Sequence, residues 1–283
     1  MRPDSAVSIA ALDSHLARDC LVAALSQSQR LAPMPEVCAR LAELSARQET
    51  DAAYLVSLVE CDPAIAGEIL RIANSPALRP RHRIVSLRRA VSWLGIAEVR
   101  NIAFAGALRG EVFNAPGHQP ECESLWREAR FGALWAREVA GLRRKHVETA
   151  YIAGLMHRVG AALALKLLSR FEFEHRTAMD AHTFGELIAE FEPACGRLLM
   201  EQWRVTDEVQ SAAVDWRAYG ASRHADLAGT VNAAHLLAEH TLHPQLCDEE
   251  AVLRDQVFED LGVSGELRAA MLSRRAHVRQ IAA

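Results

Sequence analysis

The stretch CDPAIAGEILRIANSP, residues 61–76, carries the signals for both ends of a helix. Asp62 is a good N-cap, and Pro63 suits the first helical position because an N–H there would have no partner in any case. The helix is expected to end at Asn74, which tolerates a left-handed cap, and at Ser75, which the following proline pushes out of the α region. Apolar residues at helical spacing give the helix one inward face, made of Ile65, Ile69, Leu70 and Ala73.

The chain before this stretch predicts three more helices. An amphipathic helix runs from Asp13 to about Arg30, and the sequence Leu31-Ala-Pro-Met-Pro35 ends it. A helix at 35–45 and a third one, capped by Asp51, follow. Their apolar stripes consist of Leu16, Cys20, Leu21, Ala24 and Leu25, then of Val37, Cys38, Leu41 and Leu44, and then of Leu55, Leu58 and Val59.

The chain after this stretch continues in short helices. Ser86 caps one that runs through Leu94, Gly95 breaks it, and a more apolar helix at 96–108 follows. The best linker in the chain is NAPGHQP, residues 114–120. Further helices are expected at about 122–144, 147–156, 160–169, 183–190, 193–203, 207–218, 226–241, 249–261 and 264–281.

Composition supports the same fold class. Half of the 283 residues are apolar, and only 15 Gly and 10 Pro interrupt a chain rich in Ala and Leu, so we expect an all-α protein. The net charge of −4 excludes a uniformly basic surface for nucleic acid but leaves room for a local basic patch. No nucleophile elbow, Walker loop or dinucleotide fingerprint occurs, so serine hydrolysis and ATP use lack support.

The expected location is the cytoplasm. No window approaches the roughly 18 consecutive apolar residues of a membrane span, and the first residues lack the apolar core of a leader peptide. The cysteines form no C-x-x-C pair and are expected as small core residues in a reducing compartment. They are Cys20, Cys38, Cys61, Cys122, Cys195 and Cys247.

Several short motifs occur in a fixed order over the first half of the chain. They are Leu31-x-Pro33-x-Pro35, the Leu41 and Leu44 pair, Asp62-Pro63, Leu70-x-x-Ala73-Asn74-Ser75, Ile84-x-Ser86, Leu94-Gly95, Leu125-Trp126-Arg127 and Ala153-Gly-Leu-Met-His157-Arg158-Val159-Gly160. This order resembles the HDOD domain, a bacterial signalling relative of the HD metal phosphohydrolases, over roughly residues 30–220. The resemblance implies a multi-helix fold with an N-terminal helical subdomain and a degenerate HD-like one.

We therefore expect four parts in the chain. An N-terminal helix occupies 1–30, and the HDOD domain occupies 31–225. Its two subdomains are placed at 31–113 and 122–225. A helical extension, 226–283, is expected to fold onto the domain because Leu227, Val231, Ala234, Leu237 and Ala238 recur at helical spacing and an isolated helix is marginal in water.

The resemblance also locates the positions where HD enzymes hold a divalent metal. The HD dipeptide falls at His157-Arg158, so a guanidinium, which cannot donate to a metal, replaces the bridging carboxylate. The histidine expected after Trp126-Arg127 is Glu128, and the later ligand positions fall at Glu192, Trp216 and Arg217. A cation at the bridging position repels a divalent metal by several kcal/mol even at an effective dielectric of about 20. These positions predict no catalytic residue, no metal and no cofactor.

Three readings of this relict site stay open. In the first, His157 is a neutral core histidine, and Arg158 forms an ion pair with Glu128 or, failing that, with Glu192. In the second, Glu128, His157 and Glu192 form a metal site of two carboxylates and one histidine. In the third, Arg158 and Arg217 contact the phosphates of a bound messenger such as a cyclic dinucleotide.

Other marked residues have both a structural and a functional reading. Asp62, Pro63, Asn74 and Ser75 are explained by capping, with Ser75 bonding a freed carbonyl, and the alternative is a contact between subdomains or a partner groove. A cluster of arginines with His82 is either an anion-binding surface or a solvated face, and no helix-turn-helix accompanies it, so nucleic acid is not expected as a partner. The cluster consists of Arg79, Arg81, Arg83, Arg88 and Arg89.

The remaining histidines, including His235 and His240, are expected at the surface or at helix caps, since none forms an H-E-x-x-H arrangement. The tryptophans are expected in the core. They are Trp93, Trp126, Trp135, Trp203 and Trp216.

The leading hypothesis is a non-catalytic regulatory protein that transmits a signal by contacting other signalling proteins. The family usually occurs beside receiver, cyclic-di-GMP turnover or kinase domains, and this chain shows none, so its partner is expected to be another chain or a second copy of itself. The alternative is a metal-dependent phosphohydrolase with a rearranged HD-type site. Stoichiometric bound metal together with phosphodiesterase turnover would exclude the regulatory hypothesis and support the phosphohydrolase.

Overall fold

The computed structural model describes residues 4–26, 34–46, 52–246 and 248–282, and every regular element in these ranges is a helix. The all-α prediction is therefore confirmed. The predicted features at Leu31, Pro33, Asp51 and Cys247, and the side chain of Leu44, lie outside the described residues.

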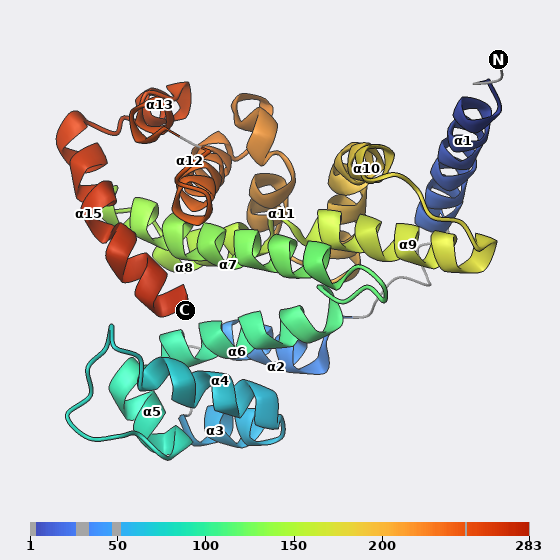
Figure 1. Cartoon of the computed structure of the whole chain (residues 1–283). Helices are drawn as coiled ribbons and strands as arrows, with labels where there is room; N and C mark the ends of the chain where they lie inside the picture. The colour runs from blue at the N-terminus through green and yellow to red at the C-terminus, as the bar shows by residue number, and fades with distance from the viewer. Residues whose placement is uncertain (1–3, 27–33, 47–51, 247, 283) are drawn as a thin grey trace.

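Five helices between residues 36 and 111 form the group at the bottom of Figure 1. They are α2 (Glu36–Ala46), α3 (Ala52–Glu60), α4 (Pro63–Ala73), α5 (Leu87–Leu94) and α6 (Ile96–Glu111). Asp62 caps α4 as predicted, since its carboxylate accepts from two backbone N–H groups at 2.9 and 3.2 Å. Ser86 caps α5 in the same way, and Gly95, with φ of +87°, separates α5 from α6.

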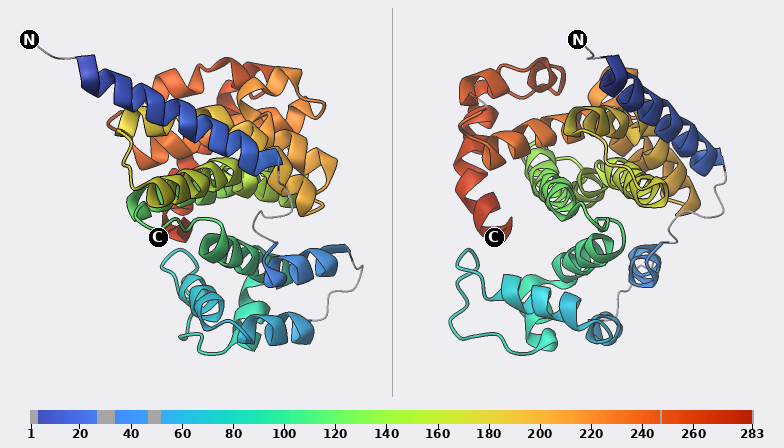
Figure 2. Two further views of the ribbon diagram at one scale, coloured as in Figure 1. Left: turned by 90° about the vertical axis from the view of Figure 1, so that its right-hand side faces the viewer. Right: turned by 45° about the vertical axis from the view of Figure 1, so that its right-hand side comes forward.

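A larger group of helices lies above them (Figure 1). It contains α7 (Gln119–Leu142), α8 (Val147–Met156), α9 (Val159–His175), α10 (Ala181–Gln202), α11 (Asp207–Val214), the 3-10 helix η2 (Trp216–Ala221) and α12 (Ala225–Leu242). The first helix, α1 (Asp4–Ser26), crosses α9 and α10, as Figure 2 shows. Arg18 of α1 forms an ion pair of 2.7 Å with Glu190 of α10. Ala17 and Leu21 are the buried residues of its described inner face, whereas Leu16, predicted inward, is exposed.

The C-terminal extension completes this group with α13 (Glu249–Leu253), α14 (Gln256–Asp260) and α15 (Gly265–Ala282). α12 lies along α7, where the indole of Trp135 donates to the hydroxyl of Thr241 at 3.0 Å. α15 also packs on α7, and its C-terminal end reaches the boundary between the two groups (Figure 1). Arg130 of α7 contacts both α15 and α4 at this boundary. It donates to the Ile281 carbonyl of α15 at 3.2 Å and lies 3.1 Å from the Glu68 carboxylate of α4.

Several predicted helices have different limits in the structure: α1 begins at Asp4 and α9 extends to His175, and four others are divided differently. The segments 183–190 and 193–203 form the single helix α10, with Pro193 inside it. Proline removes one hydrogen bond and leaves the carbonyl four residues earlier free. Pro193 and Ala189 are both exposed, so that carbonyl is free to face water. The segment 207–218 ends at Val214, where η2 follows, and 249–261 is divided into α13 and α14.

The core contains most of the predicted residues but not all of them. Trp93 is 49% exposed, so its assignment to the core is wrong, whereas the other four tryptophans are buried. Cys38, Cys122 and Cys195 are buried, but Cys61 is exposed. The segment Val147–His175 is long and apolar enough to cross a membrane, yet 83% of its most apolar window is buried inside the fold, as in a core helix.

Candidate functional site

The site lies where α7, α9, α10 and η2 meet. The structure brings together all six residues that the sequence assigned to the relict HD site. α7 supplies Glu128, the junction of α8 and α9 supplies His157 and Arg158, α10 supplies Glu192, and η2 supplies Trp216 and Arg217.

Two glycines allow the helices of the site to approach closely. A Cβ on Gly132 of α7 would lie 2.6 Å from the His157 ring, and one on Gly160 of α9 would lie 2.1 Å from the Glu192 carbonyl oxygen. Real Cβ atoms do not reach such distances, so only glycine permits these crossings. The backbone approach therefore brings the side chains of the site within hydrogen-bonding reach of one another.

Arg158 is the centre of an ion-pair network. Its Nε lies 2.8 Å from the carboxylate of Glu128, and its Nη1 donates a hydrogen bond to Glu192. Glu192 also accepts from Nη1 of Arg217 at 2.6 Å. The contact with Glu128 is an ion pair and not a well-directed hydrogen bond, since Nε lacks an aligned acceptor. The predicted pair of Arg158 with Glu128 is present, and the alternative pair with Glu192 is present as well.

Burial and charge act in opposite directions on Arg158. Burial alone lowers the pKa of its guanidinium, but the negative charges of Glu192 and Glu128 outweigh it and raise that pKa overall. Arg158 therefore stays charged, and its charge is neutralised within the fold. Glu192 is only 5% exposed and lies between two arginines.

His157 is buried and neutral, as predicted. Its Nδ1 lies 2.6 Å from the Gly154 carbonyl, which only accepts, so Nδ1 carries the proton and donates. Its Nε2 then accepts from Nδ1 of His235 at 3.1 Å. Burial, His235 and Arg158 lower the pKa of His157 well below its ordinary value.

His235 is the site residue that the sequence did not reveal. It was predicted at the surface or at a cap, but it is partly buried in α12 and packs on the Trp216 ring, with the centroids 4.2 Å apart. Burial, followed by the charges of Arg158 and Arg217, lowers the pKa of His235 to about 3. His240, given the same prediction, is also buried, and its Nε2 lies 3.4 Å from Glu249.

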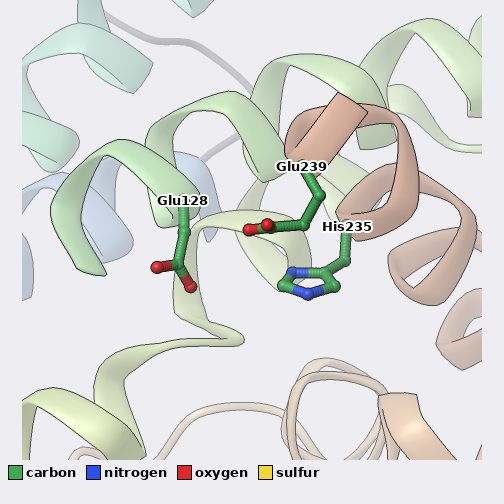
Figure 3. A group of neighbouring side chains, drawn as sticks. All are labelled: Glu128, His235 and Glu239. Atoms are coloured by element: carbon green, nitrogen blue, oxygen red, sulfur yellow. The ribbon is translucent and has the colours of Figure 1, made fainter. Parts of the chain in front are cut away.

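Glu239, four residues after His235, was also missed. His235 and Glu239 share one face of α12, and Glu128 of α7 faces them (Figure 3). One potential ligand atom from each of the three residues lies within 4.8 Å of the others. Burial, followed by the charge of Glu128, raises the pKa of Glu239. An H-x-x-x-E spacing on a predicted helix was the only signal for this pair in the sequence.

The positions that hold metal in HD enzymes do not fit a metal in this chain. Arg158 stands at the bridging position, and both carboxylates nearest to it already neutralise its charge. Of the three residues in the second reading, His157 has both ring nitrogens engaged, so Glu128, His157 and Glu192 do not form an open ligand set. Glu128, His235 and Glu239 are the arrangement that offers metal ligands.

The motif Asn74-Ser75 lies outside this site and has a structural role. The Asn74 amide donates to the carbonyls of Leu70 at 2.7 Å and Ile84 at 2.8 Å, and its oxygen accepts from the Ile84 N–H at 2.8 Å. Asn74 has φ of −97°, so the predicted left-handed cap is wrong. The hydroxyl of Ser75 is buried and has no hydrogen-bond partner, so its predicted bond to a freed carbonyl is wrong as well.

An all-helical fold with a His157-Arg158 dipeptide at the helix junction defines a protein of the HD-like class. The chain belongs to the HDOD domain family, whose sequence profile matches residues 31–216. The resemblance inferred from the motifs is thereby confirmed.

Solved structures share this fold at low sequence identity. A provisionally named metal-dependent phosphohydrolase from Shewanella amazonensis SB2B is 20% identical, with a TM-score of 0.71 over 96% of this chain and 99% of the other. An HDOD domain protein of unknown function from Geobacter sulfurreducens is 18% identical, with a TM-score of 0.67 over 95% and 98%. A provisionally named signal transduction protein from Marinobacter aquaeolei VT8 is 23% identical, with a TM-score of 0.64 over 95% and 66%.

An uncharacterized protein of Treponema pallidum (strain Nichols) is 23% identical over 198 residues. The matched part is 66% of this chain but only 38% of that protein, so the chain spans well under half of this relative.

Proposed function

We propose that this chain is a non-catalytic regulatory protein of the bacterial cytoplasm that transmits a signal by contacting other signalling proteins or a second copy of itself. The observation that carries the proposal is the place of the Arg158 guanidinium, between the carboxylates of Glu128 and Glu192. A divalent metal in an HD enzyme lowers the pKa of a bound water and neutralises the phosphate. The side chain of Arg158 fills the corresponding position and supplies no such water.

The same network disfavours a messenger bound at the relict site. Arg158 and Arg217 both contact Glu192, and Arg158 also contacts Glu128. A phosphate approaching either arginine would meet at least one of these carboxylates and would have to displace it. The two guanidiniums are therefore engaged in ion pairs within the fold and are poor ligands for a phosphate. This supports a protein partner over a cyclic dinucleotide at this site.

The test is metal analysis of the purified chain together with an assay on a chromogenic phosphodiester in the presence of added Mn²⁺. We expect well under one equivalent of bound metal and no turnover above that of buffer. Stoichiometric Mn, Fe or Zn with metal-dependent turnover would overturn the proposal. Light scattering over a concentration series then tests the self-association that the proposal includes.

The second candidate is a metal-dependent phosphohydrolase with a rearranged site. It is favoured by the approach of Glu128, His235 and Glu239, which offer one imidazole and two carboxylates. Under this candidate, Glu239→Gln abolishes metal binding and turnover together. Glu201→Gln, on an exposed residue of α10, is the matched control and leaves both unchanged.

A further inference from the structure

Positive charge is concentrated on one segment of the N-terminal helical group. No acidic residue occurs between Ile69 and Ala97, although the whole chain carries a net charge of −4. The segment contains His82 and six arginines, five of which lie in the loop before α5 and in its first turn. These five are Arg79, Arg81, Arg83, Arg88 and Arg89, named below the basic loop.

The arginines of the basic loop are available to a ligand. All five are exposed, and among the described residues none of their guanidinium groups has an ion pair or hydrogen bond. Arginines elsewhere in the fold, such as Arg137 and Arg143, are matched by a carboxylate. Unpaired guanidiniums on one short segment make this surface attractive to an anion.

An aromatic side chain accompanies the charge. Trp93 of α5 is 49% exposed and lines a hollow of about 290 Å³ together with Arg81, His82 and Arg89. A neighbouring groove of about 780 Å³ is lined by Arg83 and by Val85, which is 69% exposed. An indole beside guanidiniums provides a flat apolar surface and positive charge at the same place.

The loop is held in shape before any ligand arrives. Asn74 bonds both the N–H and the carbonyl of Ile84, so the two ends of the loop are tied to each other and to α4. Ile84 is buried, which fixes the end of the loop next to α5. In Figure 1 the loop leaves the helical group at its edge, away from α9 and α10. Binding therefore needs little ordering of the loop backbone.

We propose that the basic loop and Trp93 bind single-stranded nucleic acid, with the guanidiniums on successive phosphates and one base stacked on the indole. Base stacking on an aromatic side chain and a positively charged track for the backbone are the two components of such binding. An acidic peptide would use the charge but would leave the hollow beside Trp93 without a planar partner. The expectation that nucleic acid is not a partner rested on the absence of a helix-turn-helix and on the negative net charge of the chain. A single strand bound to a local basic patch requires neither a helix-turn-helix nor a basic net charge.

The test is the fluorescence anisotropy of labelled 12-nucleotide DNA and RNA single strands, titrated with the whole chain at several salt concentrations. We expect Trp93→Ala to weaken binding about five- to hundredfold, the range of base–aromatic stacking, and Trp93→Phe to keep most of it. The double variant Arg81→Gln/Arg89→Gln should weaken binding and reduce the salt slope by about 1.4, for two lost phosphate contacts. The control Arg170→Gln/Arg254→Gln removes the same charge from exposed positions elsewhere and should leave the affinity unchanged.

Four results would overturn the proposal. One is the absence of binding to either strand at 50 mM salt. Another is equal weakening by the control and loop variants, which would show a response to net charge alone. The third is equal affinity for a duplex of the same length. The last is displacement of the strand by polyglutamate or by a cyclic dinucleotide at the strand's own concentration, since either would assign the surface to a different ligand.

Discussion

Replacing Arg158 by alanine tests the idea that this side chain holds the helices of the site together without metal. The substitution removes the shared partner of Glu128 and Glu192. Glu192 keeps Arg217, but Glu128 is then left facing Glu239, whose pKa is already raised in part by that neighbour. Breaking a buried pair by removing one partner costs about 3–5 kcal/mol, and we expect the lower end, about 3 kcal/mol, because one of the two acids remains paired.

The expected change is large enough to measure by thermal unfolding. For a domain of this size, 1 kcal/mol shifts Tm by about 2–4 °C, so Arg158→Ala should lower Tm by about 6–12 °C at neutral pH. The double variant Glu128→Gln/Arg158→Met removes the stranded charge together with the arginine and should recover most of this loss. EDTA should leave the Tm of the unmodified chain unchanged. A harmless Arg158→Ala, or a large effect of EDTA, would refute the reasoning.

Three further predictions follow from other parts of the structure. Because the pKa values of His157 and His235 lie below the ordinary 6.5, the unfolded chain binds more protons than the folded chain as pH falls, and stability should drop between pH 7 and pH 5. His235, with a pKa of about 3, should account for about 2 kcal/mol of this loss; His157 adds to it, and the raised pKa of Glu239 offsets part of it. Urea unfolding at several pH values measures this, and a flat profile would contradict it. Asn74→Ala removes three hydrogen bonds and should cost about 2–4 kcal/mol in the same assay, whereas Ser75→Ala, which removes a hydroxyl without a partner, should be close to neutral. The helices α12 and α15 pack on α7, so the C-terminal extension should resist trypsin, and its early release in limited proteolysis would show that it is a loose arm.

The features predicted best from the sequence are those that depend on a few neighbouring residues. The cap formed by Asp62, the break at Gly95 and the helix α8 at 147–156 follow from interactions within about four positions along the chain. The ion pair of Arg158 could also be predicted, because the family motif places a cation and a carboxylate at two positions that face each other. Glu192 was expected only as an alternative to Glu128, and the sequence did not indicate that Arg158 contacts both carboxylates at once.

The features that were missed depend on how distant helices dock. His235 meets His157 across 78 positions of sequence, and the apolar stripe of α12 indicates which face is buried but not which residues of other helices it meets. Trp93 was assigned to the core from residue type, yet it is half-exposed on α5. The sequence pattern predicts two helices at 183–190 and 193–203, but α10 continues through the exposed Pro193.

The hydrogen bonds of Asn74 also separate sequence changes in the basic loop from the stability of the helices. Because the Asn74 side chain joins α4 to Ile84, residues 75–83 form a loop whose two ends are fixed. The entropy of closing such a loop rises only slowly with its length, so insertions and substitutions between these two points have little effect on the helices. Changes within residues 75–83 therefore alter what this surface binds while the helical core keeps its fold.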